Sequence, residues 1–185
     1  MAETILVFGA TGKQGGTVVR ALLQSKDKFR IRGATRNPDS EKGKALRDQG
    51  VEVVKADLND KQSIQRAVQG TQGVFLVTDT NYAAPDMYAA ELQQIKNIAD
   101  ACKEAGVGKV VFSTMPKGDS ADMLRVPELE SKADGFVYMQ SIGLPVAGIV
   151  LTFYCENLPH PYQYRKEKEG VYSLSKLNKI ISLVL

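Results

Sequence analysis

A glycine-rich run near the start of the sequence has the spacing of a turn that binds phosphate. Residues 9–16 read GATGKQGG, a GxxGxxG pattern that follows an apolar run and opens a helical pattern. In such a turn Gly9 permits the tight bend, Gly12 lets the backbone approach a pyrophosphate, and Gly15 lets the helix pack closely on the strand. The free N–H groups at the helix start then attract anionic oxygens. This context favours a dinucleotide site over a purely structural glycine turn.

A second polar group, Thr35-Arg36-Asn37, follows the next apolar run. Domains that bind NAD place an acid about 20 residues after the last glycine, where it binds the ribose 2′-hydroxyl. This sequence has Arg36 there, and no acid precedes it in that run. A guanidinium matches a 2′-phosphate in charge and in forked geometry, so Arg36 predicts NADP(H), with added charge from Lys13. A solvated arginine at a strand end is the alternative interpretation.

Two more polar groups end apolar runs and would lie at the same edge of a parallel sheet. Asp57 and Leu58 stand where a carboxylate or a backbone group contacts the adenine amine, although a helix-capping acid explains Asp57 equally well. Thr78, Asp79 and Thr80 end the fourth run, beside the point where strand order reverses and ligands bind. A plain polar turn is the alternative for these three residues.

Composition and charge argue against several other classes of protein. The net charge is +3, from 24 basic and 21 acidic residues that are interspersed, which is too weak for a nucleic-acid surface. Two distant cysteines and one histidine, His160, argue against a zinc site or a Ser-His-Asp triad. We find no signal peptide and no apolar run of the roughly 20 residues that span a membrane. We therefore expect a cytoplasmic or also nuclear chain without metal, membrane or direct nucleic-acid partners.

The elements that must position these residues alternate between apolar strands and amphipathic helices. The expected strands are residues 4–8, 29–35, 51–55, 73–78, 109–113 and 146–151. The expected helices are residues 15–25, 40–49, 60–69, 86–105 and 127–141. Near-continuous apolar strands are typical of a parallel sheet covered on both faces. The fold class is therefore α/β, a Rossmann-like doubly wound parallel sheet of about six strands in the order 3-2-1-4-5-6.

The regular alternation stops after residue 151. Residues 162–185 hold one or two short extended runs, and the sequence ends within the apolar residues 180–185. Because an exposed apolar strand is a rare end for a domain, either this strand pairs back onto the sheet or a larger C-terminal part is missing. We expect an NAD(P)-binding domain over residues 1–158, and the start of a truncated C-terminal subdomain over residues 159–185.

Taken together, these motifs resemble the NmrA-like family, an atypical branch of the short-chain dehydrogenase/reductase superfamily. The similar segments are VFGATGKQGG at 7–16, RGATRNP at 32–38, KADLND at 55–60, IGLPVAGIV at 142–150 and FYCENL at 153–158. The resemblance implies an NADP(H)-binding protein, often a redox sensor or regulator rather than an efficient enzyme. It also implies a regulatory protein partner.

The resemblance also implies roles for particular residues. The phosphate contacts would be Gly9, Ala10, Thr11, Gly12, Lys13, Gln14 and Gly15. The 2′-phosphate contacts would be Arg36 and Asn37, and the adenine contacts Asp57 and Leu58. Thr78 would lie near the cofactor and Lys132 near the nicotinamide ribose, flanked by Tyr154, Cys155, Glu156 and Asn157. From the residues alone, Lys132 is equally an exposed helical lysine. Cys155 is a redox-responsive thiol or, more simply, a packed and inert one.

The sequence departs from the superfamily's catalytic pattern. Reductases of this superfamily carry a Tyr-x-x-x-Lys pair after the fifth strand, whose lysine lowers the tyrosine pKa for proton transfer. Here Glu128, not tyrosine, stands four residues before Lys132, and the literal matches after residue 160 lie outside that helix. Val150 and Thr152 replace a frequent Arg-Pro pair. The loop over residues 78–86 is longer than usual, and family members commonly extend further.

We therefore predict an NADP(H)-binding regulatory or sensor protein with little or no dehydrogenase activity. One alternative is an NADPH-dependent reductase of small carbonyls or quinones that uses Lys132 without the tyrosine. Another is a truncated form that folds poorly and binds little nucleotide.

Overall fold

The apolar runs of the first 150 residues form one parallel sheet in the computed structural model. The structure describes residues 2–116, 126–151, 154, 164–168, 171–174 and 183–184. It divides into two compact units, Met1–Val150 and Leu151–Leu185. The domain boundary expected between residues 158 and 159 lies outside the described residues and stays a prediction.

The described strands and helices of the first unit follow the expected order. The strands are β1 Glu3–Val7, β2 Phe29–Thr35, β3 Glu52–Lys55, β4 Gly73–Leu76, β5 Lys109–Thr114 and β6 Val146–Val150. The helices are α1 Lys13–Leu23, α2 Glu41–Asp48, α3 Lys61–Val68, α4 Met87–Glu104 and α5 Pro127–Ser141. All pairings in this sheet are parallel and the strand order is β3-β2-β1-β4-β5-β6. The fold class and strand order predicted from the sequence are confirmed.

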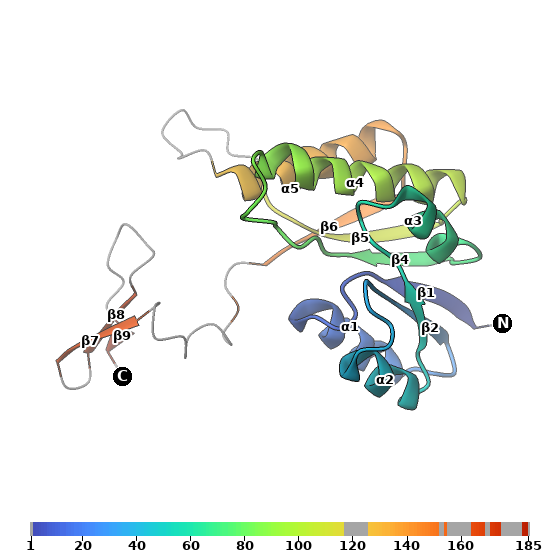
Figure 1. Cartoon of the computed structure of the whole chain (residues 1–185), viewed down its shortest axis with the longest axis horizontal. Helices are drawn as coiled ribbons and strands as arrows, with labels where there is room; N and C mark the ends of the chain where they lie inside the picture. The colour runs from blue at the N-terminus through green and yellow to red at the C-terminus, as the bar shows by residue number, and fades with distance from the viewer. Residues whose placement is uncertain are drawn as a thin grey trace. The chain divides into compact units, whose positions relative to one another are not determined.

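Helices cover both faces of this sheet (Figure 1). Helices α1 and α2 lie on one face, and α3, α4 and α5 on the other. Neighbouring residues at the end of β1 serve opposite faces. Leu6, and Phe8 just after the strand, belong to the core under α3–α5, whereas Val7 belongs to the core under α1 and α2. A central strand buried on both sides explains why β1 reads as a continuous apolar run.

Local sequence signals set the ends of several helices. Ser40 caps α2 through its side chain, which accepts from the Gly43 N–H. Asp60 and Asp86 cap α3 and α4 in the same way. Gly50 has a positive φ of 87° just after α2 and ends that helix.

The second unit contains a small antiparallel sheet. Its strands are β7 Tyr164–Lys168, β8 Val171–Leu174 and β9 Leu183–Val184. The sequence predicts one or two extended runs here, whereas the structure has three. β9 pairs with β8 rather than with a strand of the parallel sheet.

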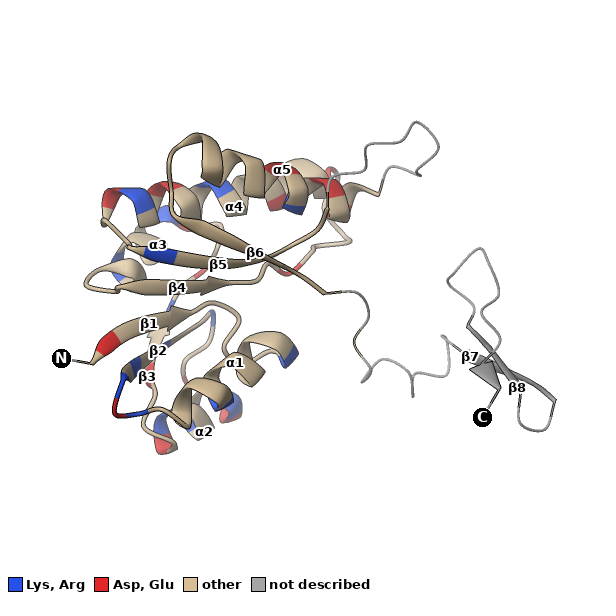
Figure 2. Cartoon of the chain, turned by 180° about the vertical axis from the view of Figure 1, so that it is seen from behind, with Lys and Arg blue, Asp and Glu red and all other residues tan. Residues whose placement is uncertain are grey.

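Charged residues of both signs occur on helices of both layers (Figure 2). Among the described residues, none of the helices combines the length and apolar character that crossing a membrane requires.

Helices α4 and α5 run side by side (Figure 1). They approach closely at a glycine of α5. A Cβ placed on Gly135 of α5 would lie 2.6 Å from Cγ2 of the buried Ile95 on α4. On either side of this contact, Tyr88 donates to Asp134 over 2.8 Å and Tyr138 donates to Asp100 over 2.6 Å. The glycine thus allows the close packing that brings polar groups of the two helices together.

We expect Gly135→Ala to lower the free energy of unfolding by about 1–3 kcal/mol, because the added methyl overfills this contact. At an open position in a helix the same change stabilises by up to about 1 kcal/mol. Chemical denaturation measures the difference. The double variant Ile95→Ala/Gly135→Ala should lose less than the sum of its single variants. A Gly135→Ala protein at least as stable as the parent would contradict the packing described here.

Candidate functional site

The glycine turn joins β1 to α1 at the carboxyl edge of the sheet. Gly9 has a φ of 66°, a conformation that favours glycine, and its carbonyl accepts from the Gly12 N–H over 2.8 Å. A Cβ on Gly15 would lie 2.2 Å from the Gly9 carbonyl oxygen. Gly12 has an ordinary extended backbone, with a φ of −89°. Gly9 and Gly15 therefore shape the turn as the sequence predicts, whereas the expected contact of Gly12 with a pyrophosphate stays a prediction.

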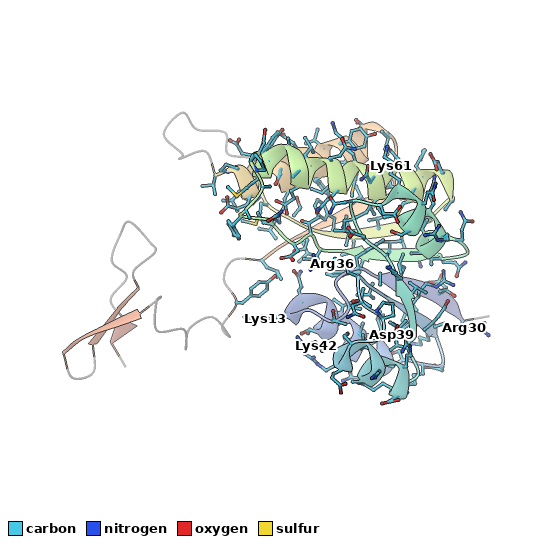
Figure 3. The ribbon with its side chains drawn as sticks, in the orientation of Figure 1. Lys13, Arg30, Arg36, Asp39, Lys42 and Lys61 are labelled. Atoms are coloured by element: carbon cyan, nitrogen blue, oxygen red, sulfur yellow. The ribbon has the colours of Figure 1, made fainter. Side chains whose placement is uncertain are left out.

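Arg36 reaches across the end of β1 toward Asp79, in the loop that follows β4. Its Nη2 lies 3.6 Å from Oδ2 of Asp79, and the two side chains are 75% and 86% exposed. Because β1 lies between β2 and β4, this ion pair spans the edge where the glycine turn begins. Figure 3 shows Lys13 and Arg36 toward this carboxyl edge and Arg30 toward the opposite one. Such an exposed pair contributes only about 0–1 kcal/mol, so an anion can displace it.

The other residues expected near adenine and the 2′-phosphate have hydrogen-bond partners in the same loop or on α4. Asn37 accepts from the Asp39 N–H, and Asp57 accepts from the backbone and side chain of Asn59. The Leu58 carbonyl accepts from the Asn97 amide of α4. Asp57 thus stabilises its own turn, and the helix cap is Asp60 instead. Their contacts with a nucleotide stay predictions.

A hydrogen bond ties the glycine turn to the neighbouring half of the sheet. Ser113, buried at the end of β5, donates to Gln14 over 3.1 Å. The turn after β1 and the end of β5 are thereby held together across the end of β4.

The most deeply buried charged side chain described at this edge is Glu91 of α4, which the sequence analysis did not select. Only 1% of its side chain is exposed. Thr78 donates to Oε1 over 2.6 Å, and Thr80 lies 3.2 Å from both oxygens. Ser131 donates to Oε2 over 2.7 Å, and Lys132 donates to Oε1 over 2.6 Å. A buried carboxylate is costly unless it is paired and hydrogen-bonded, and Glu91 meets both conditions.

Lys132 uses its whole ammonium group within this cluster. Besides Glu91, its Nζ donates to Thr80 Oγ1 over 3.1 Å and to the Glu128 carbonyl over 3.2 Å. These acceptors, all within the described residues, match the three N–H donors of an ammonium. Its side chain is only 15% exposed, so the interpretation as an exposed helical lysine is wrong. Thr78 and Thr80 both bind the buried carboxylate, and their expected place beside a ligand stays a prediction.

One sequence signal could have identified Glu91. It lies four residues before Ile95 and seven before Ile98, on the apolar stripe of α4 that continues to Cys102. An acid on the buried stripe of a helix needs a counter-charge. Its partner, however, lies 41 residues away on another helix, which no local pattern indicates.

Tyr82, in the loop between β4 and α4, faces the same cluster. Partial burial, followed by the negative charges of Glu128, Glu91 and Asp79, raises the pKa of its phenol. The side chain nevertheless remains 73% exposed. A raised pKa makes this phenol a weaker acid than an ordinary tyrosine, so it is less suited to delivering a proton at neutral pH.

The remaining candidates lie beyond the parallel sheet or outside the described residues. Tyr154 is partly exposed and belongs to the second unit. Cys155, Glu156 and Asn157 lie outside the described residues, so their expected roles stay predictions. The other cysteine, Cys102, is buried in the core, and burial raises the pKa of its thiol to about 12. A thiol with so little thiolate is chemically inert.

The sheet order and the glycine turn after β1 define an α/β protein of the Rossmann type. Within this class the chain belongs to the NmrA-like family, whose model matches residues 1–177. A similar protein is an NmrA-like family domain-containing protein of Dictyostelium discoideum. It is 32% identical over 175 residues, which cover 90% of this chain and 56% of that protein.

Solved structures share the fold. The Citrobacter sp. triphenylmethane reductase complexed with NADP(H) is 26% identical with a TM-score of 0.69, covering 83% of this chain and 51% of that one. NmrA, a negative transcriptional regulator, is 22% identical with a TM-score of 0.78, covering 94% and 54%. The chain therefore spans about half the length of these proteins.

Gly12 and Gly15 of the turn should differ in what they contribute to the free energy of unfolding. Gly15→Ala places a methyl against backbone atoms of Gly9, so we expect a loss of roughly 2–3 kcal/mol. In Gly12→Ala the added methyl would lie 3.2 Å from the Gly9 carbonyl oxygen, and the change should lower the free energy of unfolding by less than about 1 kcal/mol. Thermal unfolding measures both, at about 2–4 °C in Tm per kcal/mol. Equal melting temperatures for the two variants would refute the assignment of these roles.

Proposed function

We propose that this chain binds NADP(H) and acts as a regulatory or redox-sensing protein, with little or no hydride transfer of its own. The nucleotide would lie across the carboxyl edge, with its pyrophosphate at the turn over residues 9–15. Arg36 carries the proposal, because an exposed guanidinium stands where NAD-binding domains have an acid. The NADP(H) complex of the similar triphenylmethane reductase supports it.

The cluster around Lys132 favours binding over turnover. Reduction of a carbonyl needs a proton delivered together with the hydride, and a positioned acid contributes about 10²–10⁴-fold. The position four residues before Lys132 is Glu128, whose backbone carbonyl accepts from the lysine. The ammonium itself is bound by Glu91. Lys132 is thus held as a fixed cation, which suits recognition better than proton transfer.

A reductase of small carbonyls or quinones is the second candidate, with Tyr82 as the phenol that would deliver the proton. The negative charges of Glu128 and Glu91, the two residues that bind Lys132, help to raise the pKa of this phenol, which makes it a weaker acid and counts against the candidate. The reductase activity named for the Citrobacter protein supports the same candidate.

Cofactor preference tests the binding proposal. We expect NADPH to bind about ten- to a hundredfold more tightly than NADH, because Arg36 adds a charge-assisted contact with the 2′-phosphate. Arg36→Asp should erase or invert this preference.

Asp79→Asn frees Arg36 and should strengthen NADPH binding by up to about fivefold, without affecting NADH binding. Asp39→Asn, which breaks the exposed pair with Arg47, is the matched control. Calorimetric titration measures these affinities. Equal affinities of the unmutated protein for NADPH and NADH would refute the assignment of Arg36 to the 2′-phosphate.

Turnover distinguishes the two candidates. We expect saturable NADPH binding, with oxidation well below the ~10 per second of a typical enzyme, across aldehydes, ketones and quinones. The loss of NADPH absorbance with time measures the rate. Turnover near or above about one per second that disappears in both Lys132→Ala and Tyr82→Phe would favour the reductase instead.

A further inference from the structure

We infer that Glu91 is a positioning residue for the nicotinamide half of the site, acting through Lys132 and Thr80. This inference rests on the proposed binding of NADP(H). A doubly wound sheet has two mononucleotide-binding halves, one on each side of the reversal between β1 and β4. Arg36 ends β2 in the adenosine half, whereas Glu91 and Lys132 belong to the helices that flank β5 in the other half.

The hydrogen bonds of the Lys132 ammonium differ in strength in a way that assigns a role to Glu91. The bond between Glu91 and this ammonium is 2.6 Å long and joins opposite charges with little exposure. The other acceptors of that ammonium, Thr80 Oγ1 and the Glu128 carbonyl, are neutral and lie at 3.1 and 3.2 Å. A ribose hydroxyl is also a neutral acceptor, so it can replace either of them while the bond to Glu91 is kept.

Glu91 also holds in place the residues around Lys132, where a ribose hydroxyl would replace one of the neutral acceptors. Thr78 and Thr80, which follow β4, and Ser131, which precedes Lys132, all donate to its carboxylate. The turn after β4 and the start of α5 are therefore both hydrogen-bonded to one side chain of α4. Glu91 itself is too deeply buried to touch a nucleotide, and it acts only through the residues that it holds.

Comparison of NADPH with adenosine 2′,5′-bisphosphate isolates this role, because the bisphosphate keeps the Arg36 contacts and lacks the nicotinamide ribose. We expect Glu91→Gln in the full chain to weaken NADPH binding by about tenfold or more and to leave the bisphosphate within about twofold. Lys132→Met should do the same, and the double variant should lose no more than either single variant. Glu104→Gln, the same change at an exposed position of α4, should alter neither affinity.

Other outcomes overturn the inference. An unchanged NADPH affinity in Glu91→Gln would do so, as would equal losses for both ligands or losses that add to those of Lys132→Met. If Glu91→Gln fails to fold, Glu91→Gln/Lys132→Met removes both charges and keeps the test valid. That double variant must then lose affinity for NADPH while it keeps its affinity for the bisphosphate. An NADPH affinity equal to that of the unmutated chain would refute the positioning role of Glu91. Binding of neither ligand by the unmutated chain would overturn the proposed function and this inference together.

Discussion

A negative charge buried beneath the carboxyl edge of the sheet determines how this edge is built. The carboxylate of Glu91 cannot remain there without compensation, because an unpaired buried ion costs several kcal/mol. Its donors come from the turn after β4 and from the start of α5. Their positions depend in turn on the close approach of α4 and α5 at Gly135. One buried carboxylate therefore holds a cation and three hydroxyl groups in a fixed arrangement.

The two ends of this edge differ in their electrostatics. Arg36 and Asp79 form a long ion pair between exposed side chains, which water screens and which a ligand can separate at little cost. Glu91 and Lys132 form a short pair with little exposure, and separating them would leave an uncompensated charge. The end that holds Arg36 is therefore adaptable, and the end that holds Glu91 is rigidly organised. In the proposed NADP(H) complex, such an arrangement would suit discrimination between nucleotides at the first end and rigid orientation at the second.

The sequence predicts the fold well because its signals are local. Apolar runs mark the strands, Ser40 and Gly50 mark the limits of α2, and the glycine turn follows directly after β1. The placement of Lys132 was expected only from a family resemblance, and its pairing was not expected at all. That pairing depends on the packing of α4 against α5, which joins residues 41 positions apart. Long-range pairing of buried polar groups leaves no periodic pattern, whereas strands and caps do.

The proposed binding of NADP(H) at this edge is tested most directly by a crystal structure of the full chain with NADPH. We expect the pyrophosphate at the turn between Gly9 and Gly15, and the 2′-phosphate on Arg36 in place of Asp79. The nicotinamide ribose should lie beside Lys132, with the ion pair to Glu91 intact. A nucleotide bound away from this edge, or a Lys132 side chain that leaves Glu91 when the nucleotide binds, would contradict the site described here.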